Sequence, residues 1–436
     1  MKSKRIVWID LLKAVGFFFV ILGHFEISGN LDIWVYSFHM PLFLLATGLT
    51  FNVEKCYKTP FKDFFFNCFK KLIVPYFWLQ MISLTILYLR RIVIGGAIPK
   101  LSNYFFGILI SNTGMNKYSP GPALYYILLL FFAEIALWAV IRLAKCDRQK
   151  MFILLFLLLP ISFLKRGSGG FMHIYVTPVA MMMIFVGRIL MDAYNGGVKE
   201  KLESLAPVKY FAVSAVLLIA GSVLALLNGR SSLHGNRYGK DFAVYLICAL
   251  FINIGLSLVL MKISDKLPHK IRNMFVYIGQ STLFYLGIHT QLKNICEQIG
   301  GKFTDIKSMP FILICTVALY FFIFPLSKIT DRLFPFVIGK STVNPGRTQK
   351  LCQAFMTFFA FSPICYAIVR RFALTYIPAF ISTLTGRVVI YCAAAVLWAV
   401  LCLGISEVVR RVVPIAYLIE KPKKEKNIDS SASVSP

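Results

Sequence analysis

Four ionisable residues lie in the first two apolar runs of the chain, where ionisable groups are rare. The first run holds Asp10, Lys13 and His24, and the second holds His39 near its start. An ionisable group inside a membrane span is costly, so such residues usually serve a function. Histidine is the usual general base near neutral pH, and the two histidines therefore predict proton-transfer chemistry.

The spacing in the first run predicts a polar stripe on one helix face. Lys13 and His24 are separated by about three full turns, at about 3.6 residues per turn, and Asp10 lies about 60° from Lys13 around the axis. At about 1.5 Å of rise per residue, His24 lies roughly 16 Å farther along the helix than Lys13. Because a short turn joins the two runs, we expect His39 at a depth close to that of His24. Asp10 is a candidate catalytic residue, and it could also serve only as the ion-pair partner of Lys13.

The composition predicts the kind of protein that carries these residues. Of the 436 residues, 58% are hydrophobic and 15% are charged, and the mean hydropathy is +0.71. A soluble domain carries about 25% charged residues. The apolar residues also form long unbroken runs, which excludes a disordered chain, a disulfide-stapled secreted domain and a cytosolic enzyme. We predict an all-α, polytopic integral membrane protein.

The apolar runs predict about ten spans in a core and two more after it, at about 20 residues per span. They begin near Ile6, Ile33, Leu72, Pro122, Met151, Phe171, Tyr210, Ala243, Met274, Pro310, Leu351 and Val388. A polar stretch near residues 340–350 separates the last two. We therefore divide the chain into residues 1–345, a two-span extension over 346–415, and a disordered cytoplasmic tail over 416–436.

The basic residues predict the orientation in the membrane. There are 47 Lys and Arg against 19 Asp and Glu, a net charge of +28. Roughly twice as many Lys and Arg fall in the segments that are cytoplasmic if the N-terminus is inside, as the positive-inside rule requires. We expect both termini in the cytoplasm. The excess of positive charge then reflects contact with the lipid bilayer, and nucleic acid is not an expected partner.

Several motifs resemble membrane-bound acyltransferase family 3, and most closely its fucose 4-O-acetylase-like branch. The resemblance covers about residues 5–340. Its elements are the Lys13–His24 spacing, Phe38-His39-Met40-Pro41-Leu42-Phe43 with Thr47-Gly48, Lys71-Leu72-Ile73-Val74-Pro75-Tyr76, Leu124-Tyr125-Tyr126-Ile127, Phe185-Val186-Gly187, and Tyr277-Ile278-Gly279-Gln280-Ser281 through Ile288-His289. Where the family usually shows Arg-x-x-Arg before the third span, this chain has Cys68 and Lys71, with Lys70 beside them.

The resemblance implies transfer of an acyl group, commonly acetyl, from acyl-CoA to a hydroxyl of an envelope or extracellular glycan. Acetyl-CoA or another acyl-CoA would be a co-substrate, with no bound cofactor or metal. Lys13, Lys70 and Lys71 would bind the donor, and His24 would take the proton of the acceptor hydroxyl. His39 could orient His24, act as a second acid, or donate to the oxyanion. A bacterial cell membrane and partners from envelope-polysaccharide synthesis are the expected setting.

Further candidates come from other polar residues in or near spans. His289 matches a family span by position, Glu134 lies in the middle of a span, and Tyr126 lies in the Leu124–Ile127 element. The loop from Asn228 to Asp241 could touch the acceptor, although we favour a solvated loop.

Two other functions compete with an enzyme. A transporter also hides charge within its spans, but it often has internal repeats and paired broken helices, and neither is visible in the sequence. A membrane domain that senses a ligand, without acyl-transfer chemistry, is the second alternative.

Overall fold

The computed structural model is almost entirely helical. It describes residues 5–94, 100–111, 118–163, 170–340, 347–377 and 383–394, with residues 379, 381 and 396. The helices are α1 (Val7–His24), α2 (Gly29–Leu49), α3 (Val53–Lys58), α4 (Phe61–Cys68), α5 (Val74–Ile94), α6 (Leu101–Ile110), α7 (Tyr125–Leu143), α8 (Asp147–Leu158), α9 (Thr177–Ala193), α10 (Lys199–Ser204), α11 (Pro207–Asn228), α12 (Phe242–Ser264), α13 (His269–Gln280), α14 (Thr282–Gly300), α15 (Met309–Leu333) and α16 (Arg347–Tyr376). A two-strand hairpin, β1 (Ser231–Ser232) and β2 (Arg237–Tyr238), lies between α11 and α12.

Several helices are long and apolar enough to cross a membrane, as expected for a multi-pass membrane protein. Within the described residues there are eight: Val7–His24, Phe61–Val93, Pro122–Leu143, Phe171–Ser204, Pro207–Asn228, Phe242–Ser264, Met309–Leu333 and Cys352–Tyr376. The prediction of twelve spans is not confirmed. The run from Met151 gives only the 12-residue α8, and the run from Met274 is broken at Ser281 between α13 and α14. The 21-residue α2, which carries polar side chains such as Asp32 and His39, is not among the eight.

The chain divides into two compact units, residues 1–364 and 365–436. The domain boundary predicted at residue 345 falls among residues 341–346, which lie outside the described part of the chain. Most of the span predicted from Val388 and all of the tail predicted over 416–436 lie outside it too. Near that span the structure has a short apolar helix, Leu384–Ala394.

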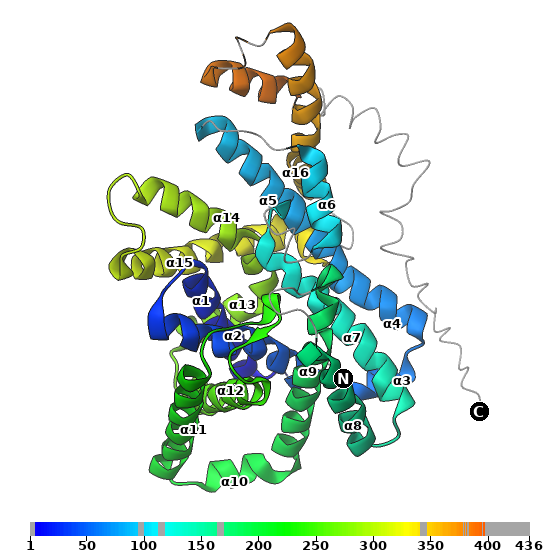
Figure 1. The fold of residues 1–436 in the computed structure, drawn as a ribbon, viewed down its shortest axis with the longest axis vertical. Coiled ribbons are helices and arrows are strands. Elements are labelled where there is room, and N and C mark those ends of the chain that lie inside the picture. Colours follow the sequence, from blue (N-terminus) through cyan, green and yellow to red (C-terminus); the bar gives the residue numbers. More distant parts are fainter. Residues whose placement is uncertain are drawn as a thin grey trace, which may run out of the picture. The chain divides into compact units, whose positions relative to one another are not determined.

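Helices α1 and α2 form the centre of the first unit. Helix α1 packs against α2, α12, α13, α14 and α15, while α2 also packs against α9, α11 and α12. Figure 1 shows α11 and α12 side by side, and these two helices hold the hairpin between their ends. The two helices with the candidate catalytic histidines are thus surrounded by the rest of the core.

Glycines allow the central helices to approach closely. Gly48 at the end of α2 faces Gly187 of α9: a Cβ added at Gly187 would lie 3.0 Å from the Cα of Gly48 and closer still to the Leu45 carbonyl. Gly279 of α13 lies in the same way against the backbone carbonyl of Asp10. These contacts are between backbones, so no side-chain movement can make room for a methyl group.

We expect Gly187→Ala to destabilise the protein, because overpacking of a tight contact typically costs about 1–3 kcal/mol. The matched control is Gly196→Ala, where φ is −87° and an added Cβ meets nothing within 4 Å. The midpoint of thermal unfolding in detergent, measured by size-exclusion chromatography of heated samples, should fall for Gly187→Ala alone. Equal midpoints for the two variants would contradict this close approach.

Candidate active site

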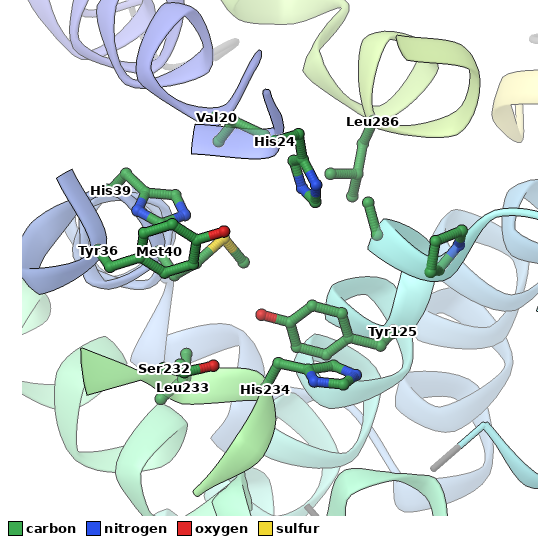
Figure 2. Close-up of a pocket in the computed structure, with 12 residues that line it drawn as sticks. Val20, His24, Tyr36, His39, Met40, Tyr125, Ser232, Leu233, His234 and Leu286 are labelled. Carbon is green, nitrogen blue, oxygen red and sulfur yellow. The ribbon is translucent and has the colours of Figure 1, made fainter. Parts of the chain in front are cut away.

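A cavity of about 150 Å³ lies at the His24 end of α1. We call it the histidine cavity. Residues from α1, α2, the start of α7, α14 and the hairpin line it: Val20, His24, Tyr36, His39, Met40, Pro122, Ala123, Tyr125, Ser232, Leu233, His234 and Leu286. Figure 2 shows the rings of His24, His39, Tyr36, Tyr125 and His234 around one space. The first two helices therefore bring their histidines to the same cavity, as the sequence predicts.

His24 is the residue of this cavity best suited to proton transfer. It is the last residue of α1, and no hydrogen bond from the described residues reaches its ring. The ring of His289 from α14 lies beside it, with 4.9 Å between ring centroids and an angle of 62° between the planes. A ring nitrogen of His24 is thus available to a substrate, and its orientation is limited by a neighbouring ring.

Helical carbonyls fix the tautomers of His39 and His289. The Nδ1 of His39 lies 2.7 Å from the Val35 carbonyl oxygen, and the Nδ1 of His289 lies 2.9 Å from that of Tyr285. A carbonyl oxygen only accepts, so Nδ1 carries the proton in each neutral ring and Nε2 is left as an acceptor. The Nε2 of His289 is buried without a hydrogen-bond partner among the described residues.

The segment between α11 and α12 closes one side of the cavity. Arg230 forms an ion pair with Asp32 of α2, and its Cζ lies 4.7 Å from the centre of the Tyr36 ring. Ser231 Oγ donates to the Tyr36 carbonyl oxygen at 3.1 Å. The sequence favoured a solvated loop here, but the structure anchors the loop on α2 and turns His234 into the cavity. The signal for this in the sequence was a group of basic and titratable residues among the glycines of the loop: Arg230, His234, Arg237 and Lys240.

A second group of rings adjoins the first. His173 contacts His234 and Tyr125, with 4.8 Å between centroids in each pair, and His234 lies 4.5 Å from Tyr125. Five of the six histidines in the chain therefore lie in or beside the cavity. The sixth, His269, begins α13 on the surface.

The structure favours Tyr125 over its neighbour Tyr126. The Tyr125 hydroxyl points into the cavity (Figure 2), whereas the candidate named from the sequence is Tyr126. Tyr126 does not line the cavity and packs its ring against Phe43 at 6.2 Å. Two adjacent tyrosines look alike in sequence, and only the packing of α7 decides which one faces the site.

We expect His234 to make stability depend on pH. Burial lowers the pKa of His234 from its ordinary value of 6.5 to about 4. The unfolded chain takes up this proton near pH 6.5 and the folded chain near pH 4, so stability should be lost as the pH falls between those values. In His234→Gln, the thermal midpoint should depend less on pH in this window, and His269→Gln should behave as wild type. The same slope in all three proteins would contradict the buried position of His234.

A larger cavity of about 890 Å³ lies at the other end of α1. We call it the lysine cavity. It is lined by Arg5, Ile6, Ile9, Asp10, Lys13, Leu49, Thr50, Phe51, Asn52, Val53, Glu54, Arg188, Met191 and Asn195. Asp10 accepts a hydrogen bond from Arg5 Nε at 2.7 Å and one from Gln280 Nε2 at 3.4 Å. Lys13 therefore lies at a polar, partly basic cavity, and the structure places Asp10 here and not beside His24.

Lys70, Lys71 and Glu134 lie outside both cavities. Lys71 Nζ pairs with Glu134 Oε1 at 3.2 Å, and Cys68 Sγ lies 3.4 Å from the second carboxylate oxygen. Lys70 and Lys71 are exposed. The contacts of Glu134 are those of a structural ion pair that joins α7 to the segment before α5. The described residues contain no group of three His, Cys, Asp or Glu side chains that could share a metal ion.

Fold and site define a multi-pass helical membrane protein with two polar cavities at opposite ends of one helix. Residues 6–328 match the family model described as an acyltransferase domain, that of acyltransferase family 3. The chain belongs to this family, and it is a membrane acyltransferase by that membership. The match to the fucose 4-O-acetylase-like branch is not confirmed. Searches of curated proteins and of solved structures gave no match.

Proposed function

We propose that this protein transfers an acyl group, in the simplest case acetyl, from acyl-CoA to a hydroxyl of a cell-envelope glycan. The observation that carries this proposal is that the His24 ring, which makes no hydrogen bond with the described residues, lines a cavity together with His39. A neutral imidazole beside a hydroxyl can remove its proton as the oxygen attacks a carbonyl, which contributes typically about 10²- to 10⁴-fold to a rate.

The two cavities suit a donor and an acceptor on opposite sides of a membrane. We propose that the N-terminus is cytoplasmic, which puts the lysine cavity inside and the histidine cavity outside, and that the C-terminus is cytoplasmic too. This orientation is supported by the larger number of Lys and Arg in the segments expected to be cytoplasmic than in those expected outside. Lys13 would then meet the phosphates or carbonyls of acyl-CoA as it enters.

Lys13 and His24 lie on the same helix, about 16 Å apart along its axis at about 1.5 Å per residue. We propose that the acyl end of the donor reaches along this helix from the lysine cavity toward His24. Lys70 and Lys71 remain candidates for a first contact with the donor at the surface. The proposed setting is a bacterial envelope, with polysaccharide-synthesis enzymes as partners.

Labelled acetyl-CoA tests the reaction class. Membrane vesicles with and without the protein receive acetyl-CoA labelled in the acetyl group, on the side of the lysine cavity. Transfer predicts label in a product that mild alkali releases as acetate, and only where the protein is present. Label that crosses the membrane as unreacted donor would favour a transporter. Donor that binds and is neither consumed nor moved would favour a sensing domain.

A further inference from the structure

One hydroxyl in the histidine cavity has a proton and no acceptor. Tyr125 is the first residue of α7, the residue is 8% exposed, and its hydroxyl points into the cavity (Figure 2). No hydrogen bond from the described residues reaches this hydroxyl, while the ring packs against those of His173 and His234, which also contact each other. A buried polar group is normally paired, so an unpaired one that faces a cavity points to a ligand atom.

The other polar groups on the cavity wall are less suited to donate. The Tyr36 hydroxyl already donates to the Gly23 carbonyl oxygen at 3.2 Å. Neutral His39 uses its proton on the Val35 carbonyl, so its Nε2 can only accept. This argues against a neutral His39 as the oxyanion donor. The Ser232 hydroxyl and the His234 ring, both on the hairpin, are the remaining rivals, and Ser232→Ala is included in the test.

We infer that Tyr125 is a catalytic residue that donates a hydrogen bond to the oxyanion formed during acyl transfer. The inference rests on the proposed function. The acceptor oxygen forms a bond to the acyl carbon, its proton moves to His24, and the former carbonyl oxygen becomes negative. Collapse of this intermediate breaks the bond from carbon to sulfur, and His24 returns the proton to the departing thiolate. Tyr125 keeps its own proton throughout.

Packing gives this donor a fixed direction. The contacts with the His173 and His234 rings, and the short turn Pro122–Leu124 before α7, limit rotation of the Tyr125 side chain. A donor that is already oriented costs no reorganisation when charge develops, and removal of one such donor typically lowers kcat by about 10²- to 10³-fold.

The test compares Tyr125→Phe with Tyr210→Phe. Tyr210 of α11 is buried and donates to the Leu258 carbonyl oxygen of α12 at 2.8 Å. Its variant therefore also loses a buried hydroxyl, but Tyr210 does not line the histidine cavity. Rates of alkali-labile acetyl formation are measured over a range of acetyl-CoA concentrations. We expect kcat to fall about 100-fold for Tyr125→Phe, with KM and the Kd for acetyl-CoA within twofold of wild type. Tyr210→Phe should keep the kcat of wild type.

Three results would overturn the inference. One is a wild-type kcat in Tyr125→Phe while His24→Gln is inactive, which leaves the proposed function intact. Another is a large loss in Ser232→Ala and none in Tyr125→Phe. The third is no ester product from wild type under any condition, in which case the proposed function fails as well. A protein with 3-fluorotyrosine at position 125 checks the role without removing the hydroxyl: it should match or exceed wild-type kcat, and a much lower kcat would contradict a donor role.

Discussion

Replacing His24 by Gln should lower the rate of acyl transfer by about 10²- to 10⁴-fold, the typical contribution of a general base. Gln keeps similar bulk and a polar end, but it cannot accept and return a proton near neutral pH. Because the His24 ring has no hydrogen bond within the described structure, its loss should leave the fold unchanged. The rate of ester formation is measured at saturating acetyl-CoA on protein quantified after size-exclusion chromatography.

His269→Gln is the matched control for this substitution. His269 lies on the surface at the start of α13, outside both cavities. It should keep wild-type activity, and His24→Gln should keep wild-type affinity for acetyl-CoA. Full activity of His24→Gln would remove this residue as the base. A loss of both activity and donor binding would instead show a defect in folding.

Replacing Lys13 by Met should weaken donor binding by at least about tenfold. Lys13 is half-buried and lines the lysine cavity, and the charges that act on it are Asp10, Lys71 and Arg5. A hydrogen bond to a charged group is worth about 1.5–3 kcal/mol, which corresponds to about 10- to 150-fold in Kd. Equilibrium dialysis of labelled acetyl-CoA against the purified protein in detergent measures the effect.

Two further variants sharpen the test at Lys13. Lys13→Arg keeps the positive charge and should retain most of the affinity, whereas Lys209→Gln removes an exposed charge at the start of α11 and should change nothing. Unchanged affinity in Lys13→Met would exclude the lysine cavity as the donor site. A strong effect of Lys70→Gln in that case would move the site to the surface before α5.

The sequence was enough to predict the helical membrane class and that the first two helices are neighbours. Ionisable residues in apolar runs are conspicuous, which is why His24 and His39 could be singled out. The short turn between the two runs is why α1 and α2 could be expected to meet. His289 was a candidate by its position alone, and its contact with the His24 ring needs the packing of α14 on α1. The roles of these residues stay predictions.

Other parts of the site depend on contacts between distant segments, which one sequence does not reveal. The ion pair from Arg230 to Asp32 turns a polar loop into a wall of the histidine cavity. The pair from Lys71 to Glu134 links two residues that looked like separate candidates. The predicted number of spans is not confirmed, for a related reason: hydropathy alone does not show that the helix breaks at Ser281 or that α8 has only 12 residues.

The most direct test of the central claim is the ester-linked acetyl content of cell envelopes. Cells without the gene, cells with wild type and cells with His24→Ala are compared at matched membrane levels of the protein, and acetate released by mild alkali is measured by mass spectrometry. We expect released acetate from wild type and background amounts from His24→Ala. Equal release from wild type and His24→Ala, above the cells without the gene, would contradict acyl transfer that depends on His24.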